Sequence, residues 1–424
     1  MTTPTSTPAA PRRLRRWVRP TAILAILGPG LIAANAGNDS GGIATYSSAG
    51  AQFGYKPLFL AVVITLMLIV VQEMAARVGV FGGEGIMALV REQFSLRVGA
   101  FAVVCLLVAN LGLVVSEFAG IGAALELFGV SRYVAVPAAA VVLIAVVVFG
   151  SYRWAERIFL TLALAFLAYP IAMVLARPDW KAVAVNAVVP HVVGTKAFLL
   201  MAVALVGTTI TPYMQLYQSA AVADRGADPD EYPRVRTDAV GGAIIAGGIF
   251  ICILIATAAT IGGTGPLDSA AQAARALEPV AGSGAQTLFG IGLLGASALA
   301  AAVVPLSTAY GIAEAVGAER SVSRRFSEAP FFLGFFTAQV VVGAAVALVP
   351  VNLFSLLIGM QILNGLVTPI ILGFLYVLSN RRAVVGSAVS SPRNRVAALA
   401  CVGTVSALAL VVVGVTIAGW FGVG

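Results

Sequence analysis

Charged residues are scarce in this sequence. Only 10% of its 424 residues are Asp, Glu, Lys or Arg, whereas 60% are hydrophobic, and the mean hydropathy is +0.98. Soluble globular domains carry about a quarter charged residues. The composition therefore excludes a soluble enzyme domain and indicates a chain that folds in a lipid bilayer.

Histidine and cysteine are scarce too. His191 is the only histidine and falls in a predicted loop, and Cys105, Cys252 and Cys401 stand singly in apolar stretches. Because these residues have neither zinc-site nor disulfide spacing, we interpret the cysteines as packing residues. With no histidine in any predicted span, the sequence offers neither a catalytic metal site nor a nucleophile with its base. We therefore predict that the protein is not an enzyme.

Long apolar stretches are abundant, and a helix needs roughly twenty such residues to cross a bilayer. We predict spans at 21–50, 57–80, 98–128, 132–150, 154–177, 195–222, 239–262, 284–318, 327–349, 351–379 and 396–420. The fold class is therefore all-α integral membrane. Residues 82–94 are predicted as a short helix at the cytoplasmic surface, and residues 224–237 as a solvated connection.

The basic residues fall mainly on one side of these spans. When the connections are assigned alternately to the two sides, 20 Lys and Arg residues lie on one side and 6 on the other. The positive-inside rule then places the N-terminus, with a basic tail at 1–20, in the cytoplasm. We expect the protein to lie in the plasma membrane. An odd number of spans places the C-terminus outside. The net charge of +8 thus reflects membrane topology, and no nucleic-acid partner is expected.

Ten of the spans divide into two inverted five-helix repeats, 21–178 and 195–379, followed by an eleventh helix at 396–420. The first span of each repeat is interrupted at a corresponding place, by Asn38–Gly42 and by Gly207–Tyr213. Gly and Pro weaken or break helices. They are also common in membrane helices generally, but paired interruptions, one bearing an acid, indicate the binding site of a secondary transporter.

Asp39 is the most informative single residue, because a carboxylate in mid-membrane is costly unless it faces a cavity or a cation. Asn35, Asn38 and Asp39 share one helix face. Freed carbonyl oxygens are expected beside them, in the unwound segment Ser40, Gly41 and Gly42. Such oxygens are hard ligands, suited to Mg²⁺, Ca²⁺ or Mn²⁺. Alternatively, Asp39 only caps the second half of the broken helix.

The sixth span supplies the facing surface, around its interruption at Pro212 and Tyr213. Its polar stripe consists of Thr208, Thr211, Gln215 and Gln218. A stripe of this kind either joins helices or lines a water path, and we favour the path. Weaker candidates for the pathway are Glu117 in the third span and the pair Gln361 and Asn364 in the tenth. Glu73 and Arg77 have the spacing of a structural ion pair.

These residues resemble a known family. Gly28-Pro29-Gly30 followed by Asp39-Ser40-Gly41-Gly42 is similar to the first span of Nramp divalent-metal transporters, where GPG precedes Asp-Pro-Gly-Asn at the same spacing. Thr211-Pro212-Tyr213 stands where that family has Met-Pro-His, and Glu117, Gln361 and Pro369 also match its spacing. The resemblance covers roughly 21–420. It implies a LeuT-like fold with the first and sixth helices broken.

The resemblance also implies roles for individual residues. Asp39 stands at the metal-binding aspartate, the carbonyls of Ala36 and Thr208 at backbone ligands, and Gln361 near the same site. The chain departs from the family at several positions. Gly42 replaces a ligand asparagine, Thr211 a ligand methionine, Tyr213 and Gln218 two histidines, and Val114 an acid of the proton route.

Those departures from the family that replace metal ligands change the predicted metal preference in the same way. Losing a thioether removes a preference for transition metals, and losing two ligand side chains leaves room for the water that Mg²⁺ retains. The pattern is similar to the Nramp-related magnesium transporter branch, so we predict uptake of Mg²⁺, with Mn²⁺ also accepted. Proton coupling is not required, since a divalent ion gains about 4.6 kcal/mol in crossing a potential of about 100 mV. No cofactor is expected, because the metal ion is the substrate.

Two other transport functions remain open at this point. One is ordinary proton-coupled Nramp transport of Mn²⁺ or Fe²⁺, which acidification of vesicles during uptake would reveal. The other is an organic-substrate transporter of the same fold, for example for amino acids, which titration with amino acids against Mg²⁺ would separate. The sequence does not fix the oligomeric state, and a monomer is compatible with it.

Overall fold

A computed structural model describes residues 38–148, 164–191, 193–316 and 330–420 of the chain. The regular elements in these ranges are all helices, and eight helical segments are long and apolar enough to cross a membrane. The all-helical membrane fold predicted from the composition is therefore confirmed. Gly28–Gly30, Asn35, Ala36 and residues 154–163 of the fifth predicted span lie outside the described residues.

The first half of the chain contains helices of very different lengths. They are α3 (Ser40–Phe53), α4 (Leu58–Gly82), α5 (Ile86–Gln93), α6 (Leu96–Glu126), α7 (Arg132–Val148), η1 (Leu164–Leu167), α9 (Ala168–Leu175) and α10 (Trp180–Val188). The short helix predicted at 82–94 corresponds to α5. Gly83, at the end of α4, has a positive φ of 66°, which favours glycine and lets the chain leave the span there.

The second half begins with a broken span. Its elements are α11 (Lys196–Thr209), α12 (Pro212–Asp224), η2 (Pro229–Glu231), α13 (Tyr232–Ile261), α14 (Ala270–Ala274), η3 (Arg275–Leu277), α15 (Glu278–Ala281), η4 (Gly282–Gly284), α16 (Ala285–Val316), α17 (Pro330–Ala347), α18 (Leu353–Asn380), α19 (Arg382–Val385) and α20 (Pro392–Trp420).

The connection predicted at 224–237 is largely exposed, as expected, but its second part belongs to a helix. Helix α13 begins at Tyr232, several residues before the predicted span at 239. Pro229 and Pro233 occupy first-turn positions, where a missing N–H costs nothing, and Asp230 and Glu231 lie where the positive end of a helix dipole stabilises acids. The polar composition of this segment therefore marks a helix start.

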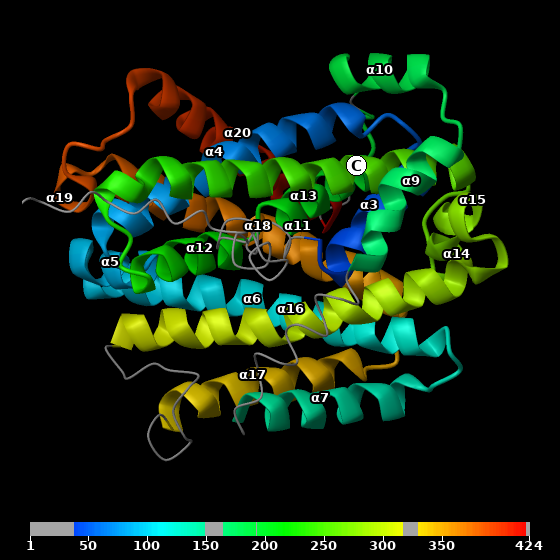
Figure 1. The fold of residues 1–424 in the computed structure, drawn as a ribbon, viewed down its shortest axis with the longest axis horizontal. Coiled ribbons are helices and arrows are strands. Elements are labelled where there is room, and N and C mark those ends of the chain that lie inside the picture. The colour runs from blue at the N-terminus through cyan, green and yellow to red at the C-terminus, as the bar shows by residue number, and fades with distance from the viewer. Residues whose placement is uncertain (1–37, 149–163, 192, 317–329, 421–424) are drawn as a thin grey trace, which may run out of the picture.

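The long helices pack in three groups (Figure 1). Helices α11 and α18 lie in the middle of the molecule, with α4, α13 and α20 on one side and α6, α16, α17 and α7 on the other. Helix α3 is short and contacts α13, α18, α11 and α6. The two halves of the broken sixth span thus meet α18 and α4 at the centre of the fold.

Glycines permit the central helices to approach closely. A Cβ atom at Gly207 of α11 would lie 2.1 Å from the Gln361 carbonyl oxygen of α18. One at Gly365 of α18 would lie 2.3 Å from the Val203 carbonyl oxygen of α11. Helix association in a bilayer depends on such close packing of small residues. These two glycines therefore fix α11 against α18.

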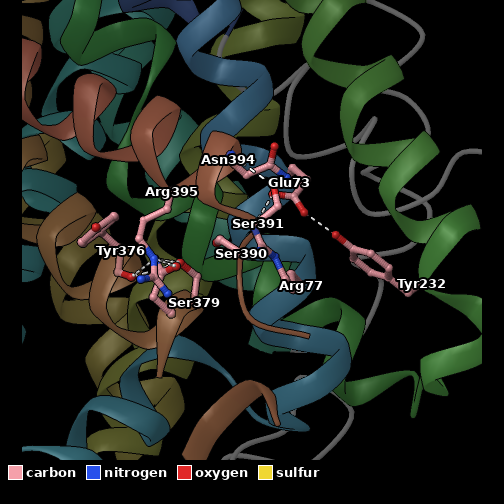
Figure 2. A network of polar contacts seen from close by, with 10 residues as sticks. Glu73, Arg77, Tyr232, Tyr376, Ser379, Ser390, Ser391, Asn394 and Arg395 are labelled. Carbon is pink, nitrogen blue, oxygen red and sulfur yellow. Dashed lines mark hydrogen bonds and ion pairs between the residues drawn. The ribbon is translucent and has the colours of Figure 1, made fainter. Parts of the chain in front are cut away.

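A buried ion pair joins three segments at the end of α4 (Figure 2). Arg77 lies 2.6 Å from Glu73 Oε2 and also donates to the Ser390 hydroxyl, at 2.6 Å, in the segment before α20. The Tyr232 hydroxyl of α13 donates to the other Glu73 oxygen. The structural ion pair predicted from the spacing of Glu73 and Arg77 is therefore confirmed. It also connects α4 to two other parts of the chain.

Candidate functional site

Asp39 caps the N-terminus of α3 with one of its two carboxylate oxygens. Its Oδ1 accepts from the Gly42 N–H at 2.6 Å, and its carbonyl accepts from Ile43 N at 3.0 Å. Asp39 is only 1% exposed, and Oδ2 has no hydrogen-bond partner among the described residues. Capping is therefore part of the role of Asp39, but it leaves the second carboxyl oxygen buried and without a hydrogen-bond partner among the described residues.

The sixth span is broken between α11 and α12. Thr211 has extended backbone angles, φ −72° and ψ 140°, directly before Pro212 at the first position of α12. Because proline has no N–H, it cannot donate to the Thr208 carbonyl, which would be its partner in a continuous helix. The interruption predicted at Gly207–Tyr213 is confirmed, and it frees a carbonyl oxygen inside the protein.

Polar side chains of α18 cover other carbonyls at this break. Asn364 Nδ2 donates to the Gly207 carbonyl at 2.5 Å, and the Thr368 hydroxyl approaches the Ile210 carbonyl at 3.4 Å. Unsatisfied backbone groups in a membrane cost several kcal/mol each, so these contacts stabilise the broken conformation. Asn364, predicted to reach a central site, therefore contacts the sixth span directly.

Gln361 of α18 contacts both α3 and α11. Its carbonyl oxygen packs on Gly207 of α11, while its side chain covers Gly41 of α3 so closely that a Cβ there would lie 1.8 Å from Nε2. The amide nitrogen lies 3.5 Å from Ser116 Oγ of α6. Its Oε1 is buried without a hydrogen-bond partner in the described part of the chain. Gln361 thus packs its amide group against the first turn of α3.

Glu117 of α6 also reaches this turn. Its Oε2 accepts from the Ser40 hydroxyl at 2.8 Å and from the Ser40 N–H at 3.4 Å. Glu117 is fully buried, and no hydrogen bond to its Oε1 is found in the described ranges. The structure therefore places the Glu117 carboxyl group against Ser40, the residue next to Asp39, at the start of α3.

The other predicted site residues are distributed along the break and beyond it. Asn38 precedes Asp39, and Tyr213 and Gln215 follow Pro212 in α12. Gln215 and Gln218 are buried on a helix whose main neighbour is α4, and the structure gives their amides no hydrogen-bond partner within its described ranges. All of these residues are buried: Asn38, Ser40, Gly41, Gly42, Thr208, Thr211, Pro212, Tyr213, Gln215 and Gln218.

The chemistry of the site is that of oxygen donors. Within the described residues, no group of three His, Cys, Asp or Glu side chains could hold a metal ion. The candidate donors are instead Asp39 Oδ2 and Gln361 Oε1, both buried without a hydrogen-bond partner in the described ranges, and the Thr208 carbonyl, to which Pro212 cannot donate. Such a set is hard and incomplete, which suits a cation that keeps some of its water.

The sequence profile described as "Natural resistance-associated macrophage protein-like", Nramp, matches residues 30–414. The chain belongs to the Nramp family. Divalent metal cation transporter MntH of Ralstonia nicotianae is 33% identical over 308 residues, 68% of this chain and 68% of that protein. MntH of Deinococcus radiodurans is 31% identical over 316 residues, 70% of this chain and 69% of that protein.

A crystal structure of a manganese transporter from Eremococcus coleocola has a similar fold. It aligns with this Nramp chain at a TM-score of 0.77 and 21% identity, covering 95% of this chain and 88% of that one. The likeness confirms the LeuT-like fold class. The count of eleven spans and the repeat boundaries at 21–178 and 195–379 stay predictions.

Sequence reasoning missed several residues that shape the site of this Nramp chain. Thr368 was not singled out, although 361, 364 and 368 have the i, i+3, i+7 spacing of one helix face. Tyr46 of α3 was also missed. Its hydroxyl lies 3.1 Å from Thr209 Oγ1 and joins α3 to α11 directly.

Proposed function

We propose that this protein takes up divalent metal cations, principally Mg²⁺ with Mn²⁺ also accepted, by alternating access around Asp39. The observation that supports this most directly is the buried Oδ2 of Asp39 at the N-terminus of α3, which has no hydrogen-bond partner among the described residues. A charge in that position is costly unless a cation or a polar pathway meets it. The names of the relatives support a divalent metal ion as the substrate class.

The proposed ligands are the Asp39 carboxylate, the carbonyls of Ala36 and Thr208, and the side chains of Thr211 and Gln361. Other residues would support or line the site: Asn35, Asn38, the segment Ser40–Gly42, Glu117 and Asn364. The pathway along α12 would be lined by Pro212, Tyr213, Gln215 and Gln218. Ala36 enters through the family resemblance alone, and Asn35 through its predicted helix face shared with Asn38 and Asp39. This set contains no sulfur and no imidazole.

The preference for Mg²⁺ follows from those donors. Thr211 offers a hydroxyl where a thioether would favour a softer transition metal, and Gly42 offers no side-chain ligand. Two absent ligands leave space for water, and Mg²⁺ characteristically retains several waters. A partly hydrated Mg²⁺ is therefore the cation that we expect this site to hold best.

We further propose that transport does not require protons. Val114 is fully buried in α6, and a Cβ at Gly343 of α17 would lie 2.5 Å from Val114 Cγ1. Apolar packing this close leaves no space for water between α6 and α17 at that level. The described helices also contain no histidine. A potential of about 100 mV, negative inside, alone supports accumulation of a divalent ion by roughly two-thousand-fold.

We place the protein in the cell membrane with its N-terminus in the cytoplasm, on the asymmetry of its basic residues. The decisive experiment uses proteoliposomes with an imposed inside-negative potential and an internal pH dye. We expect uptake of Mg²⁺ and, less readily, Mn²⁺, without a change of internal pH. Metal-dependent acidification would instead show the proton-coupled alternative, and absence of uptake of either metal would reject the proposal.

A further inference from the structure

We propose that Glu117 is a positioning residue for the cation site, acting through Ser40. This inference rests on the proposed function, because it concerns how the Asp39 oxygen is held. Glu117 lies on α6, in a different part of the chain from Asp39, and its contacts are with the residue next to Asp39. In this proposal the hydrogen bonds of Glu117 orient the first turn of α3.

The first turn of α3 needs acceptors for its N–H groups, since the first four N–H groups of a helix have no partner within it. Asp39 satisfies one of them through Gly42, and Glu117 satisfies another through Ser40 N. The Ser40 hydroxyl donates to the same Glu117 oxygen at 2.8 Å. The turn is therefore held from two sides, by its own cap and by α6.

Close packing supports the hydrogen bonds. Gly120 lies one turn beyond Glu117, and a Cβ there would lie 2.4 Å from Ser40 Cβ and 2.5 Å from Ser297 Oγ of α16. The Ser40 hydroxyl is also 3.4 Å from the Ser116 carbonyl. Ser40 is thus enclosed between α6 and α16, where a change at Glu117 would be transmitted to it.

Serine at position 40 is what makes this contact possible. It provides both an N–H and a hydroxyl to Glu117, whereas proline at the same position would provide neither. Because Ser40 follows Asp39 directly, moving the turn by a fraction of an ångström changes where Asp39 Oδ2 points. Glu117 therefore acts on cation binding through geometry, and an uncharged acceptor of similar shape should replace much of its effect.

The test compares Glu117→Ala, Glu117→Gln, Ser40→Ala and the double variant Glu117→Ala/Ser40→Ala. For each, the dissociation constant of Mg²⁺ is measured by titration of the purified full chain, and KM and kcat by uptake into proteoliposomes. Size-exclusion profiles and thermal unfolding show whether each variant is folded. Asp39→Asn and the parent protein are measured beside them.

We expect Glu117→Ala to raise the Mg²⁺ dissociation constant about tenfold, the scale of a lost hydrogen bond to a charged group. Glu117→Gln should recover most of that loss, because its amide oxygen can still accept from Ser40. Ser40→Ala should lie between the two. The double variant should be no worse than Glu117→Ala, because both changes remove the same contact.

Three results would overturn the inference. One is Glu117→Gln binding as weakly as Glu117→Ala, which would assign the role to charge or to a proton. The second is additive losses in the double variant. The third, if Glu117→Ala does not fold, is unchanged binding in Ser40→Ala. Failure of the parent protein to bind Mg²⁺ would reject the proposed function itself, which separates the two conclusions.

Discussion

Gln361 lies directly over Gly41, so that a methyl group on Gly41 would approach its Nε2 to 1.8 Å. Ser116 Oγ would lie 2.8 Å from the same methyl group. We therefore expect Gly41→Ala to displace Gln361 from the start of α3 and to reduce metal uptake at least about tenfold, because a small misplacement of binding groups lowers rates strongly. Uptake by the purified variant in proteoliposomes measures this.

The matched control is Gly373→Ala, in the same helix as Gln361. A Cβ at Gly373 meets no atom within 4 Å. Alanine is also the better helix former by about 1 kcal/mol. Gly373→Ala should therefore keep uptake and thermal stability. Normal uptake by Gly41→Ala would contradict the close contact.

Asn364 links α18 to the broken end of α11 through the Gly207 carbonyl. Replacing it by leucine removes the donor and leaves that carbonyl buried without a partner, a loss of roughly 1–3 kcal/mol. We expect Asn364→Leu to lower the unfolding temperature and to slow uptake. Asn186→Leu is the control, because Asn186 Nδ2 donates to the Ala182 carbonyl within its own helix, α10. Equal effects of the two changes would argue against a special role for Asn364.

Arg77 belongs to the buried network at the end of α4. Removing it leaves Glu73 buried without its cation, and breaking one side of a buried pair typically costs 3–5 kcal/mol. We expect Arg77→Ala to unfold at a distinctly lower temperature in detergent than the parent. Arg97→Ala, at an exposed position on α6, should unfold like the parent. Similar unfolding temperatures for both variants would show that the network contributes little.

Thr211 tests the origin of the metal preference. It precedes α12 without making a side-chain cap bond, so a substitution there removes no cap. A thioether at this position would favour the softer ion, and we expect Thr211→Met to raise uptake of Mn²⁺ relative to Mg²⁺ on the order of tenfold. Competition uptake with both metals measures the ratio. An unchanged ratio would show that selectivity arises elsewhere.

The break between α11 and α12 and the start of α3 after Asp39 could be predicted because they follow from local chemistry, but Ser40, Gly41 and Gly42, predicted as unwound, form the first turn of α3. Pro212 removes a backbone bond wherever it stands, and Asp39 before Gly41 and Gly42 is both a capping residue and a buried acid. The long spans could be predicted as well, because the thickness of the bilayer fixes the length of an apolar helix that crosses it. These features depend on neighbours within a few residues along the chain.

The contacts that shape the site could not be predicted in the same way. Ser40 and Glu117 are 77 residues apart, and Asn364 and Gly207 are 157 residues apart. Their pairing depends on how α6, α11 and α18 pack, which no local pattern specifies. The early start of α13 was missed for a different reason, because a run of charged residues and prolines was interpreted as a loop when it also fits a helix N-terminus.

Metal uptake by Asp39→Asn tests the central claim most directly. Asparagine caps a helix as well as aspartate does, so the bond to Gly42 should persist while the negative charge disappears. We predict that the variant folds like the parent and that its potential-driven uptake of Mg²⁺ and Mn²⁺ falls to the level of empty liposomes. Uptake at the rate of the parent would contradict the assignment of Asp39 as the group that receives the cation.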